Sequence, residues 1–303
     1  MKKVLLAATL AAATATATTG TAFAQATDTI AKAKSTGSVT MGVRESSGAL
    51  SYTLGDGKYA GFHVEICQRI LAELEKQAGK KLEVRYQPVT SQNRIPLVQN
   101  GTVDIECGST TNNAARAKDV GFLNTTYVEE VRIAVKANSG IKGIADLKGK
   151  TIATTTGTTS VQHLRKHERA NGVDFKEVFG KDHADSFLLM ESGRADAFVM
   201  DGSILAGNIA NAKNPADFKI VGEVLNVEPI AIMIRKDDAG LKKLGNDVIA
   251  GLVKSGEMNK LWDKWFLQPI PPKNVKVGLA LSESTKDAWA NPNDKPMEDY
   301  AKK

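Results

Sequence analysis

Clusters of polar and charged side chains follow several apolar stretches of this sequence, at the points where strands are expected to end. Three of these clusters contain an arginine, and these residues are Arg44, Arg94 and Arg116. A guanidinium group forms forked, charge-assisted hydrogen bonds with a carboxylate or a phosphate. Ligands of open α/β sheets bind beyond the carboxyl ends of the strands. The three arginines therefore predict a binding site for an anionic ligand.

The clearest of these clusters is the stretch ECGSTTNNAAR, which ends at Arg116. Apolar and polar residues alternate over 102–107, which predicts a half-buried strand, and the residues after Asn113 favour a helix. The loop between them contains Ser109 and Thr111 and would lie at a helix N-terminus, where free N–H groups suit a carboxylate or a phosphate. A capped helix with Arg116 in solvent explains this stretch alone equally well.

The other predicted strand ends supply further polar groups, and among them Asp201 and Asp182 offer the obvious carboxylates. An α-amino acid needs one cation for its carboxylate and one carboxylate for its ammonium group. Two arginines and His183 would then remain for a second carboxylate. Taken singly, each residue also has an ordinary explanation: Arg44 on the surface, Arg94 at a helix start, His183 in a loop and Asp201 as a helix cap. The polar residues singled out at these further strand ends are Ser91, Thr159, His183 and Asp201.

The N-terminal segment, residues 1–24, has the features of a signal peptide. It contains two lysines, an apolar stretch and an A-x-A site that ends at Ala24. We expect cleavage after Ala24 and export of a soluble protein to the periplasm. The remaining residues are enough for two domains, and no other apolar run reaches the length of a membrane span. The formal charge of +6 is modest, and no dense Lys/Arg cluster interleaved with aromatic residues indicates a nucleic-acid partner.

Strand and helix patterns alternate along the chain, which indicates an α/β protein with mainly parallel sheets. The chain is too long for one compact sheet of this kind, so we expect two lobes. Residues 124–130 separate two strand–helix series, and residues 224–230 return the chain to the first lobe. Helices are expected over 62–78 and 241–266, and the polar segment 291–303 is expected to be loose. The expected strands are 38–43, 82–89, 102–107, 131–137, 151–155, 176–180, 195–201, 218–223 and 230–236.

The chain contains two cysteines, Cys67 and Cys107. Two cysteines in an exported protein suggest a disulfide. Cys67 lies in the predicted helix 62–78, which could pack against the strand that ends at Cys107. Two separate buried thiols are an equal alternative, and the sequence leaves the choice open.

Two other classes of function have weaker support. His163 and His167 are one helical turn apart and Glu168 is adjacent, which is a spacing that metal sites use, although a solvated helix face is the commoner explanation. An enzyme would need a catalytic constellation, and we find no Ser-His-Asp arrangement. We therefore predict a binding protein that is not an enzyme and that needs neither a metal nor a cofactor.

Several motifs together resemble one family. The segments VRESSG, TSQNRIPLVQNGTVDIECGSTTNN, GTTS, KDHADS, MDGS and FLQPIPPKN are similar to those of the periplasmic glutamate/aspartate-binding proteins of ABC importers. This resemblance implies a two-lobe, Venus-flytrap fold with two crossover strands. It places the first lobe at 25–127 and 228–303 and the second lobe at 128–227. It also implies a monomer that delivers L-glutamate or L-aspartate to an inner-membrane permease. The alternatives are a binding protein for another polar amino acid or a dehydratase-like enzyme on this fold.

The resemblance also implies a role for nine residues of this sequence. Those that match the α-carboxylate contacts of the family are Arg116, Thr111 and Thr159. Those that match the ammonium contacts are Ser109 and Asp201. Those that match the contacts of the side-chain carboxylate are Arg44, Ser91, Arg94 and His183. The resemblance does not rank glutamate against aspartate, and it carries no disulfide over to Cys67 and Cys107.

Overall fold

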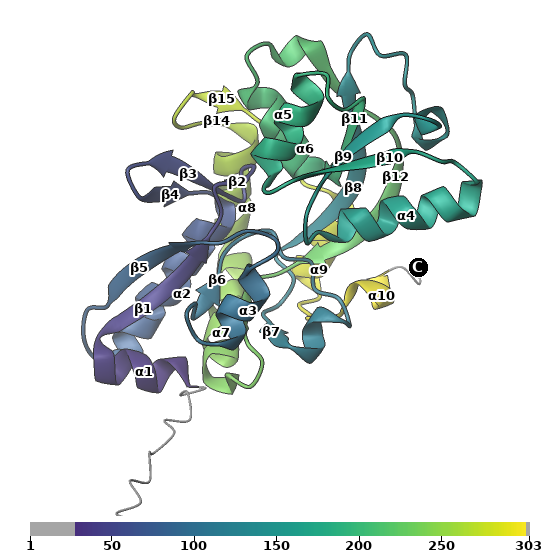
Figure 1. Cartoon of the computed structure of the whole chain (residues 1–303). Helices are drawn as coiled ribbons and strands as arrows, with labels where there is room; N and C mark the ends of the chain where they lie inside the picture. The colour runs from purple at the N-terminus through teal and green to yellow at the C-terminus, as the bar shows by residue number, and fades with distance from the viewer. Residues whose placement is uncertain (1–27, 301–303) are drawn as a thin grey trace, which may run out of the picture.

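The computed structural model describes residues 28–300, which form two α/β lobes joined by two long strands (Figure 1). Each lobe is built on a five-stranded sheet. The predicted signal peptide and its cleavage site after Ala24 lie outside the described residues. Over 28–300, no helix combines the length and the apolar character that a membrane span requires.

The sheet of the first lobe has the strand order β5-β1-β6-β13-β7. Its strands are β5 (Glu83–Pro88), β1 (Ser38–Val43), β6 (Ile105–Glu106), β13 (Met233–Arg235) and β7 (Val120–Phe122). β1 pairs in parallel with β5 and β6, whereas β13 pairs antiparallel to β6 and β7. The expectation of mainly parallel sheets is therefore only partly right, because β13 enters this sheet on the way back from the second lobe.

Helices and a small hairpin sheet complete the first lobe. They are α1 (Thr29–Thr36), α2 (Phe62–Ala78), α3 (Arg94–Gln99), the turn η1 (Arg116–Lys118), and the strands β2 (Ser46–Ser47), β3 (Ser51–Gly55) and β4 (Lys58–Ala60). The predicted bounds of α2 and β1 agree with the structure. α2 buries Phe62, Ile66, Ile70 and Leu74, as its helical periodicity predicts.

Cys67 of α2 and Cys107 after β6 form a disulfide, so of the two alternatives that the sequence left open, the disulfide is correct.

The sheet of the second lobe has the strand order β10-β9-β11-β8-β12. Its strands are β10 (Lys176–Gly180), β9 (Thr151–Thr155), β11 (Ala197–Asp201), β8 (Tyr127–Lys136) and β12 (Phe218–Ile230). Its helices are η2 (Ile144–Leu147), α4 (Thr159–Asn171), α5 (His183–Glu191), α6 (Gly202–Asn211) and η3 (Pro215–Asp217). The expected strands 151–155 and 176–180 agree with β9 and β10.

β8 and β12 are the two crossover strands, and they pair antiparallel to each other from one lobe toward the other (Figure 1). Their register places Tyr127 opposite Ile230 and Glu129 opposite Glu228. The pairing is interrupted by a bulge between Val221 and Asn226. β12 is thus longer than the expected strand 218–223, because it continues through the segment that returns the chain to the first lobe.

The C-terminal part of the chain supports the crossover strands. It consists of α7 (Ala239–Lys254), α8 (Glu257–Trp262), η4 (Asp263–Leu267), β14 (Pro269–Ile270), β15 (Val275–Lys276), α9 (Glu283–Ala290) and α10 (Met297–Tyr300). The expected helix 241–266 is interrupted at Gly256, which has a φ of +77°. The Trp289 indole donates to Thr126 O at 2.8 Å, and Asn112 donates to Asp294 O at 2.8 Å. The prediction of a loose tail is therefore wrong for the described residues up to Tyr300.

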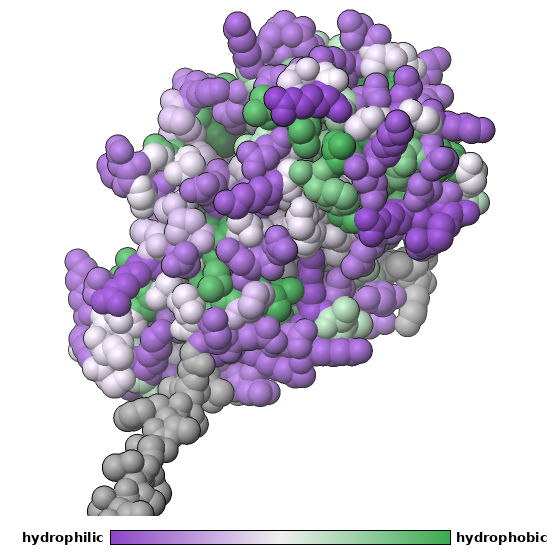
Figure 2. All heavy atoms as spheres, viewed as in Figure 1, coloured by the Kyte–Doolittle hydropathy of each residue, from purple (hydrophilic) through white to green (hydrophobic). Residues whose placement is uncertain are grey.

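The surface shown in Figure 2 is mainly hydrophilic, and hydrophobic residues form separate patches on it. Over residues 28–300, the large hydrophobic side chains that are exposed are Tyr86, Phe179, Leu188 and Val224. The apolar side chains mostly lie in the cores of the two lobes.

Candidate ligand-binding site

A small cavity lies between the lobes, among the loops that follow the strands of both sheets. Its free volume is about 10 Å³, so the two lobes are closed onto each other around it. Such a volume corresponds to about one water molecule. Seven of the nine predicted site residues line it. The lining residues are Ser91, Arg94, Ser109 and Thr111 from the first lobe, and Thr158, Thr159, His183, Met200 and Asp201 from the second lobe.

Arg44 and Arg116, the other two predicted residues, lie beside the cavity and form hydrogen bonds with residues around it. Arg44 is fully buried, and its Nη2 donates to Ser91 Oγ at 3.0 Å. Arg116 donates from Nη1 to Thr111 O at 3.0 Å and from Nη2 to Gly157 O at 3.2 Å. Thr111 and Gly157 belong to different lobes, so Arg116 joins the lobes at one edge of the cavity.

The loop that carries Thr111 differs from its prediction. The residues after Asn113 form only the short turn η1, not an α-helix. The reason is tertiary pairing: Asn112 N donates to Pro229 O at 2.9 Å, and Ala231 N donates to Thr110 O at 3.1 Å. This pairing with the end of β12 fixes the hydroxyl loop against the crossover, in place of the predicted helix N-terminus.

Arg94 is a buried cation in the cavity wall. Its Nη1 donates to Ser109 O at 3.1 Å. Burial, together with the positive charges of Arg116 and Arg44, lowers the pKa of Arg94 to about 9. The guanidinium therefore remains charged at neutral pH, and its charge would be stabilised by an anionic ligand.

Several buried polar atoms at the site have no hydrogen-bond partner in the protein. Among residues 28–300, Arg44 Nε and Nη1 and Arg94 Nε have no hydrogen-bond partner. The same holds for Asp201 Oδ1. A buried polar atom without a partner costs about 1–3 kcal/mol, and more when it belongs to a charged group. Donors on the first lobe and an acceptor on the second lobe thus fit a ligand that carries both an anion and a cation.

Asp201 ends β11 directly before α6, where the sequence allowed a helix cap. Within the described chain, its side chain makes no capping hydrogen bond to α6. It is buried, and burial raises its pKa well above the usual value, with further contributions from Glu129 and Glu228. A cap is therefore the wrong interpretation, and an ammonium group would supply the donor and the positive charge that the Asp201 carboxylate lacks.

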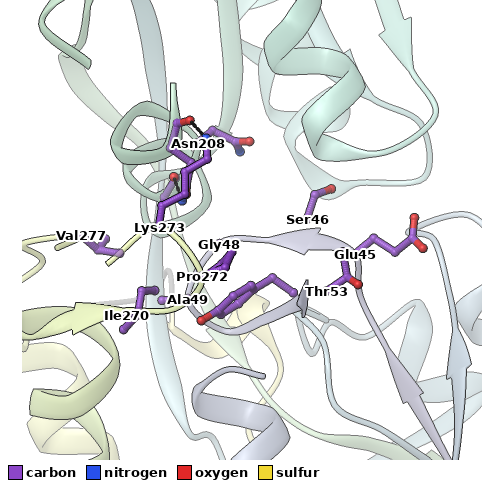
Figure 3. Close-up of a pocket in the computed structure, with 13 residues that line it drawn as sticks. Glu45, Ser46, Gly48, Ala49, Thr53, Asn208, Ile270, Pro272, Lys273 and Val277 are labelled. Carbon is purple, nitrogen blue, oxygen red and sulfur yellow. Dashed lines mark hydrogen bonds between the residues drawn. The ribbon is translucent and has the colours of Figure 1, made fainter. Parts of the chain in front are cut away.

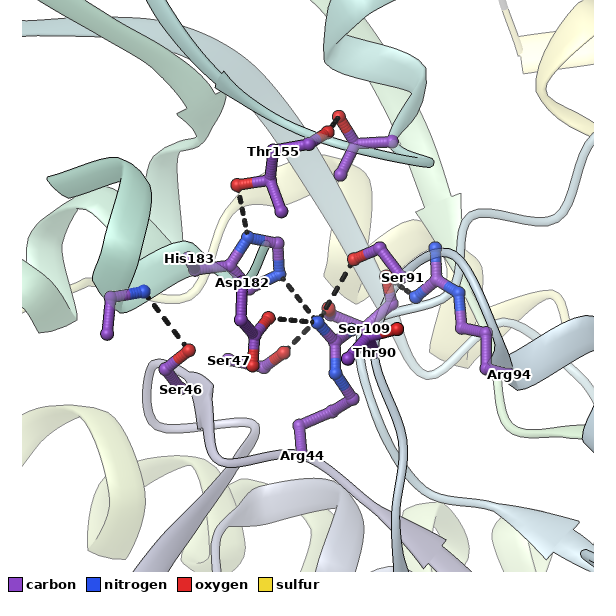
Figure 4. Close-up of polar contacts among 12 residues, drawn as sticks. Arg44, Ser46, Ser47, Thr90, Ser91, Arg94, Ser109, Thr155, Asp182 and His183 are labelled. Atoms are coloured by element: carbon purple, nitrogen blue, oxygen red, sulfur yellow. Dashed lines mark hydrogen bonds and ion pairs between the residues drawn. The ribbon is translucent and has the colours of Figure 1, made fainter. Parts of the chain in front are cut away.

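His183 begins α5 and faces Arg44 across the gap between the lobes (Figure 4). Its Nε2 lies 3.2 Å from Arg44 Nη2, and its Nδ1 lies 3.1 Å from Thr155 Oγ1. Burial, followed by the charge of Arg44, lowers the pKa of His183 to about 3. Because arginine can only donate, Nε2 accepts and Nδ1 carries the proton. His183 is therefore a neutral hydrogen-bonding group and not a third cation for a second carboxylate.

Two glutamates on the crossover strands were missed by sequence reasoning. Glu129 and Glu228 lie directly opposite each other, and both are buried. Glu228 Oε2 accepts from the hydroxyls of Thr111 and Thr159, so it contacts one predicted site residue of each lobe. Burial raises the pKa of Glu129 to about 7. The signal that could have revealed both residues is their position inside the two expected crossover segments.

The two histidines that suggested a metal site have separate protein partners. His163 Nε2 lies 2.6 Å from Glu228 Oε1, and His167 Nε2 lies 3.1 Å from Leu225 O. Across the described part of the chain, no group of three or more His, Cys, Asp or Glu residues is arranged to hold a metal ion. Both rings thus attach α4 to the crossover strand β12.

Comparison with known proteins assigns the family. The family model of the bacterial extracellular solute-binding proteins, family 3, matches residues 39–268. The chain belongs to this family. The glutamate/aspartate import solute-binding protein of Escherichia coli (strain K12) is 43% identical over 270 residues, which cover 89% of each chain. The L-glutamate/L-aspartate-binding protein of Pseudomonas aeruginosa is 44% identical over 275 residues, which cover 90% of this chain and 91% of that one.

Solved structures agree with this assignment. An ancestral arginine-binding protein bound to arginine is 30% identical, with a TM-score of 0.67 over 76% of this chain and 98% of that one. The predicted fold, a two-lobe α/β fold of the periplasmic binding-protein type, is therefore confirmed. The family and these relatives are binding proteins of transport systems, and the chain is a binding protein rather than an enzyme.

A second cavity of about 250 Å³ opens on the flank of this family member (Figure 3). It lies between the loop after β1, the helix α6 and the β14–β15 hairpin. Of the described residues that line it, Lys273 is the one cation, and its Nζ already donates to Asn211 O at 2.7 Å. This cavity thus lacks the arginines that an acidic ligand requires, whereas the cavity around Arg94 and Asp201 has both a cation and a carboxylate.

Proposed function

We propose that this protein captures L-glutamate or L-aspartate between its two lobes in the periplasm and delivers it, as a monomer, to an inner-membrane ABC permease. The observation that carries the proposal is the set of unpaired atoms around the cavity, with guanidinium donors on the first lobe and the Asp201 carboxylate on the second. The relatives, which are glutamate/aspartate-binding and import proteins, support the same ligand class.

The charges of the site divide the ligand into three parts. Arg116, with Thr111 and Thr159, holds the α-carboxylate. Asp201, with Ser109, holds the ammonium group. The side-chain carboxylate is held by Arg44, Ser91 and Arg94, and His183 orients Arg44 by accepting from it at Nε2. A zwitterion with one additional carboxylate is the smallest amino acid that uses all three arginines.

Closure of the lobes accompanies binding in this proposal. The first lobe comprises residues 25–127 and 228–303, and the second comprises 128–227. A ligand that contacts both lobes stabilises the closed state, since only a difference in contacts between two states can shift their equilibrium. The crossover strands β8 and β12 are the hinge, and a permease can then distinguish the loaded protein by its closed shape.

A binding protein for another polar amino acid is the competing proposal. The family resemblance to an arginine-bound structure raises it, because the fold accepts such a ligand. Two buried cations next to the cavity argue against a cationic side chain here, since Arg44 and Arg94 would repel it.

Calorimetric titration of the protein, first freed of ligand by unfolding and refolding, tests this function. We expect binding of L-glutamate and L-aspartate, and much weaker binding of glutamine and asparagine. A neutral amide side chain leaves the buried charge of Arg94 without an anion, at a cost of about 2–5 kcal/mol. Tight binding of arginine or lysine without binding of either acidic amino acid would overturn the proposal.

A further inference from the structure

Asp182, which lies outside the nine predicted site residues, contacts the arginine of the side-chain subsite. Its Oδ1 accepts from Arg44 Nη2 at 2.6 Å, across the gap between the lobes (Figure 4). Arg44 belongs to the first lobe, whereas Asp182 directly precedes α5 of the second. A carboxylate of the protein therefore already occupies a donor that the proposed function assigns to the ligand.

The contacts of Arg44 are unevenly distributed over its guanidinium group. Nη2 contacts Ser91, Asp182 and His183, whereas Nε and Nη1 have no partner among residues 28–300. An incoming carboxylate forms its best contact with arginine through two parallel N–H groups. Such a forked contact through the Nη1 and Nη2 edge requires that Asp182 gives up Nη2.

Asp182 has a route away from Arg44, and Arg44 has none. The side chain of Asp182 is 15% exposed, whereas that of Arg44 is completely buried. Asp182 can therefore turn toward water while Arg44 stays enclosed. Although burial alone would raise the pKa of Asp182, the nearby Arg44 and His183 lower it. Asp182 is thus an anion at neutral pH and a true competitor for the guanidinium.

We propose that Asp182 is a specificity-determining residue, which competes with the side-chain carboxylate of the ligand for Arg44. This inference rests on the proposed function. A ligand with a neutral amide side chain leaves the Arg44–Asp182 pair intact, so Asp182 does not oppose it. A dicarboxylate has to displace Asp182, so the pair lowers the affinity for glutamate and aspartate selectively, and it re-forms when the ligand leaves.

The decisive variant is Asp182→Asn, because asparagine keeps the size of the side chain and is an equally good N-cap residue for α5. In calorimetric titrations, the affinity for glutamate and aspartate should rise about tenfold, since close charge pairs are coupled at least this strongly. The affinity for glutamine should stay unchanged. The ratio of the glutamate and glutamine affinities is therefore the quantity to measure.

Asp185→Asn is the matched control. Asp185 lies on the same turn of α5 and accepts from Asp182 N at 3.3 Å, so its replacement removes the same charge from the same helix end. We expect an unchanged ratio for this variant. If Asp185→Asn changes the ratio as much as Asp182→Asn does, the effect is a general one of charge and the inference is wrong.

Other outcomes would overturn the inference or the proposed function. An Asp182→Asn variant that loses affinity equally for all ligands would show that Asp182 only holds the lobes closed, and this would overturn the inference. An unchanged ratio would also overturn it. If the variant does not fold, Asp182→Ser, which also caps a helix, has to show the same rise in the ratio. A wild-type protein that binds no acidic amino acid would instead contradict the proposed function itself.

Discussion

The two lobes bring opposite charges to the cavity between them. The first lobe contributes the cations, which are Arg44, Arg94 and Arg116. The second lobe contributes the carboxylates of Asp182, Asp201 and Glu129, although Glu228 and Glu106 of the first lobe also act on Arg116. Closure therefore brings unlike charges together, as the contact of 2.6 Å between Arg44 and Asp182 shows. A zwitterionic ligand with two carboxylates fits this division when its anions face the first lobe and its ammonium group faces the second.

The largest expected effect comes from removal of a first-lobe cation. Arg116→Ala should abolish binding of every amino acid, because Arg116 joins Thr111 and Gly157 across the lobes and is proposed to hold the common α-carboxylate. The loss should be about 3 kcal/mol or more, as for charge pairs that become desolvated on binding. Arg94→Ala should instead weaken dicarboxylates selectively. Titration of both variants with glutamate and glutamine measures the difference.

Arg85→Ala is the control for both variants, because Arg85 is an exposed arginine of the same lobe that pairs with Glu83 at the surface. The Arg85→Ala variant should bind glutamate and glutamine with the affinities of the wild type. If Arg116→Ala and Arg94→Ala lose affinity equally for every ligand, the proposed division of the cations between two carboxylates is incorrect.

A second prediction tests closure of the lobes with a substitution that leaves all charges unchanged. Gly48 of the first lobe and Gly207 of α6 meet backbone to backbone, and a Cβ atom at position 207 would lie 2.8 Å from Gly48 Cα. Gly207→Ala should therefore hold the lobes apart, although alanine itself favours the helix by about 0.5–1 kcal/mol. We expect weaker binding of all ligands and a larger radius of gyration by small-angle scattering with glutamate present.

Gly251→Ala in α7 is the matched helix control, since no described neighbour lies within 4 Å of a Cβ atom there. It should bind and close like the wild type. A Gly207→Ala variant with the wild-type affinity and radius would refute the contact between Gly48 and Gly207 as part of the closed state.

A smaller effect is expected from pH. In the closed protein without ligand, burial raises the pKa of Glu129 to about 7 and that of Asp201 well above its usual value, so these groups bind protons there. The ammonium group of the ligand favours the ionised carboxylates, so binding releases protons. The affinity for glutamate should rise with pH from about 5.5 to 8, a range in which glutamate, with a side-chain pKa of about 4.3, keeps its charge.

The stability of the folded protein without ligand should fall as the pH rises, in contrast to its affinity for glutamate. The folded state retains the Glu129 proton up to a pKa of about 7, whereas an unperturbed glutamate has a pKa of 4.5. This contribution to stability is thus complete below about pH 4.5 and is lost as the pH rises through about 7.

Calorimetry of glutamate binding in buffers of different ionisation heat counts the protons that binding releases. No release at pH 6.5 in the wild type, or an undiminished release in Glu129→Gln, would argue against this assignment.

The sequence predicted much of the fold because local patterns are strong in its regular elements. The period of Phe62, Ile66 and Ile70 defined α2, and alternation or apolar runs between turn residues defined β1, β9 and β10. The helix expected after Asn113 does not form, since the preceding residues pair with β12. The antiparallel members of both sheets were missed, because strand direction depends on where the chain enters a sheet.

The candidate site was predictable where residues follow strand ends, and less so elsewhere. Loops after parallel strands converge by geometry, and this places Ser91, His183 and Asp201 around one cavity. Glu129 and Glu228 were missed, because a carboxylate inside a strand normally indicates a solvated face. In the closed structure both carboxylates are buried at the crossover strands, and Arg44 and Asp182 are paired across the lobes.

A crystal structure of the protein with bound L-glutamate is the most direct test of the proposed division between a cationic and an anionic lobe. We expect the ligand between the lobes, with its side-chain carboxylate against Arg44 and Arg94 and its α-carboxylate against Arg116. The ammonium group should contact Asp201 of the second lobe. A ligand in the reverse orientation, or one that contacts a single lobe, would contradict it.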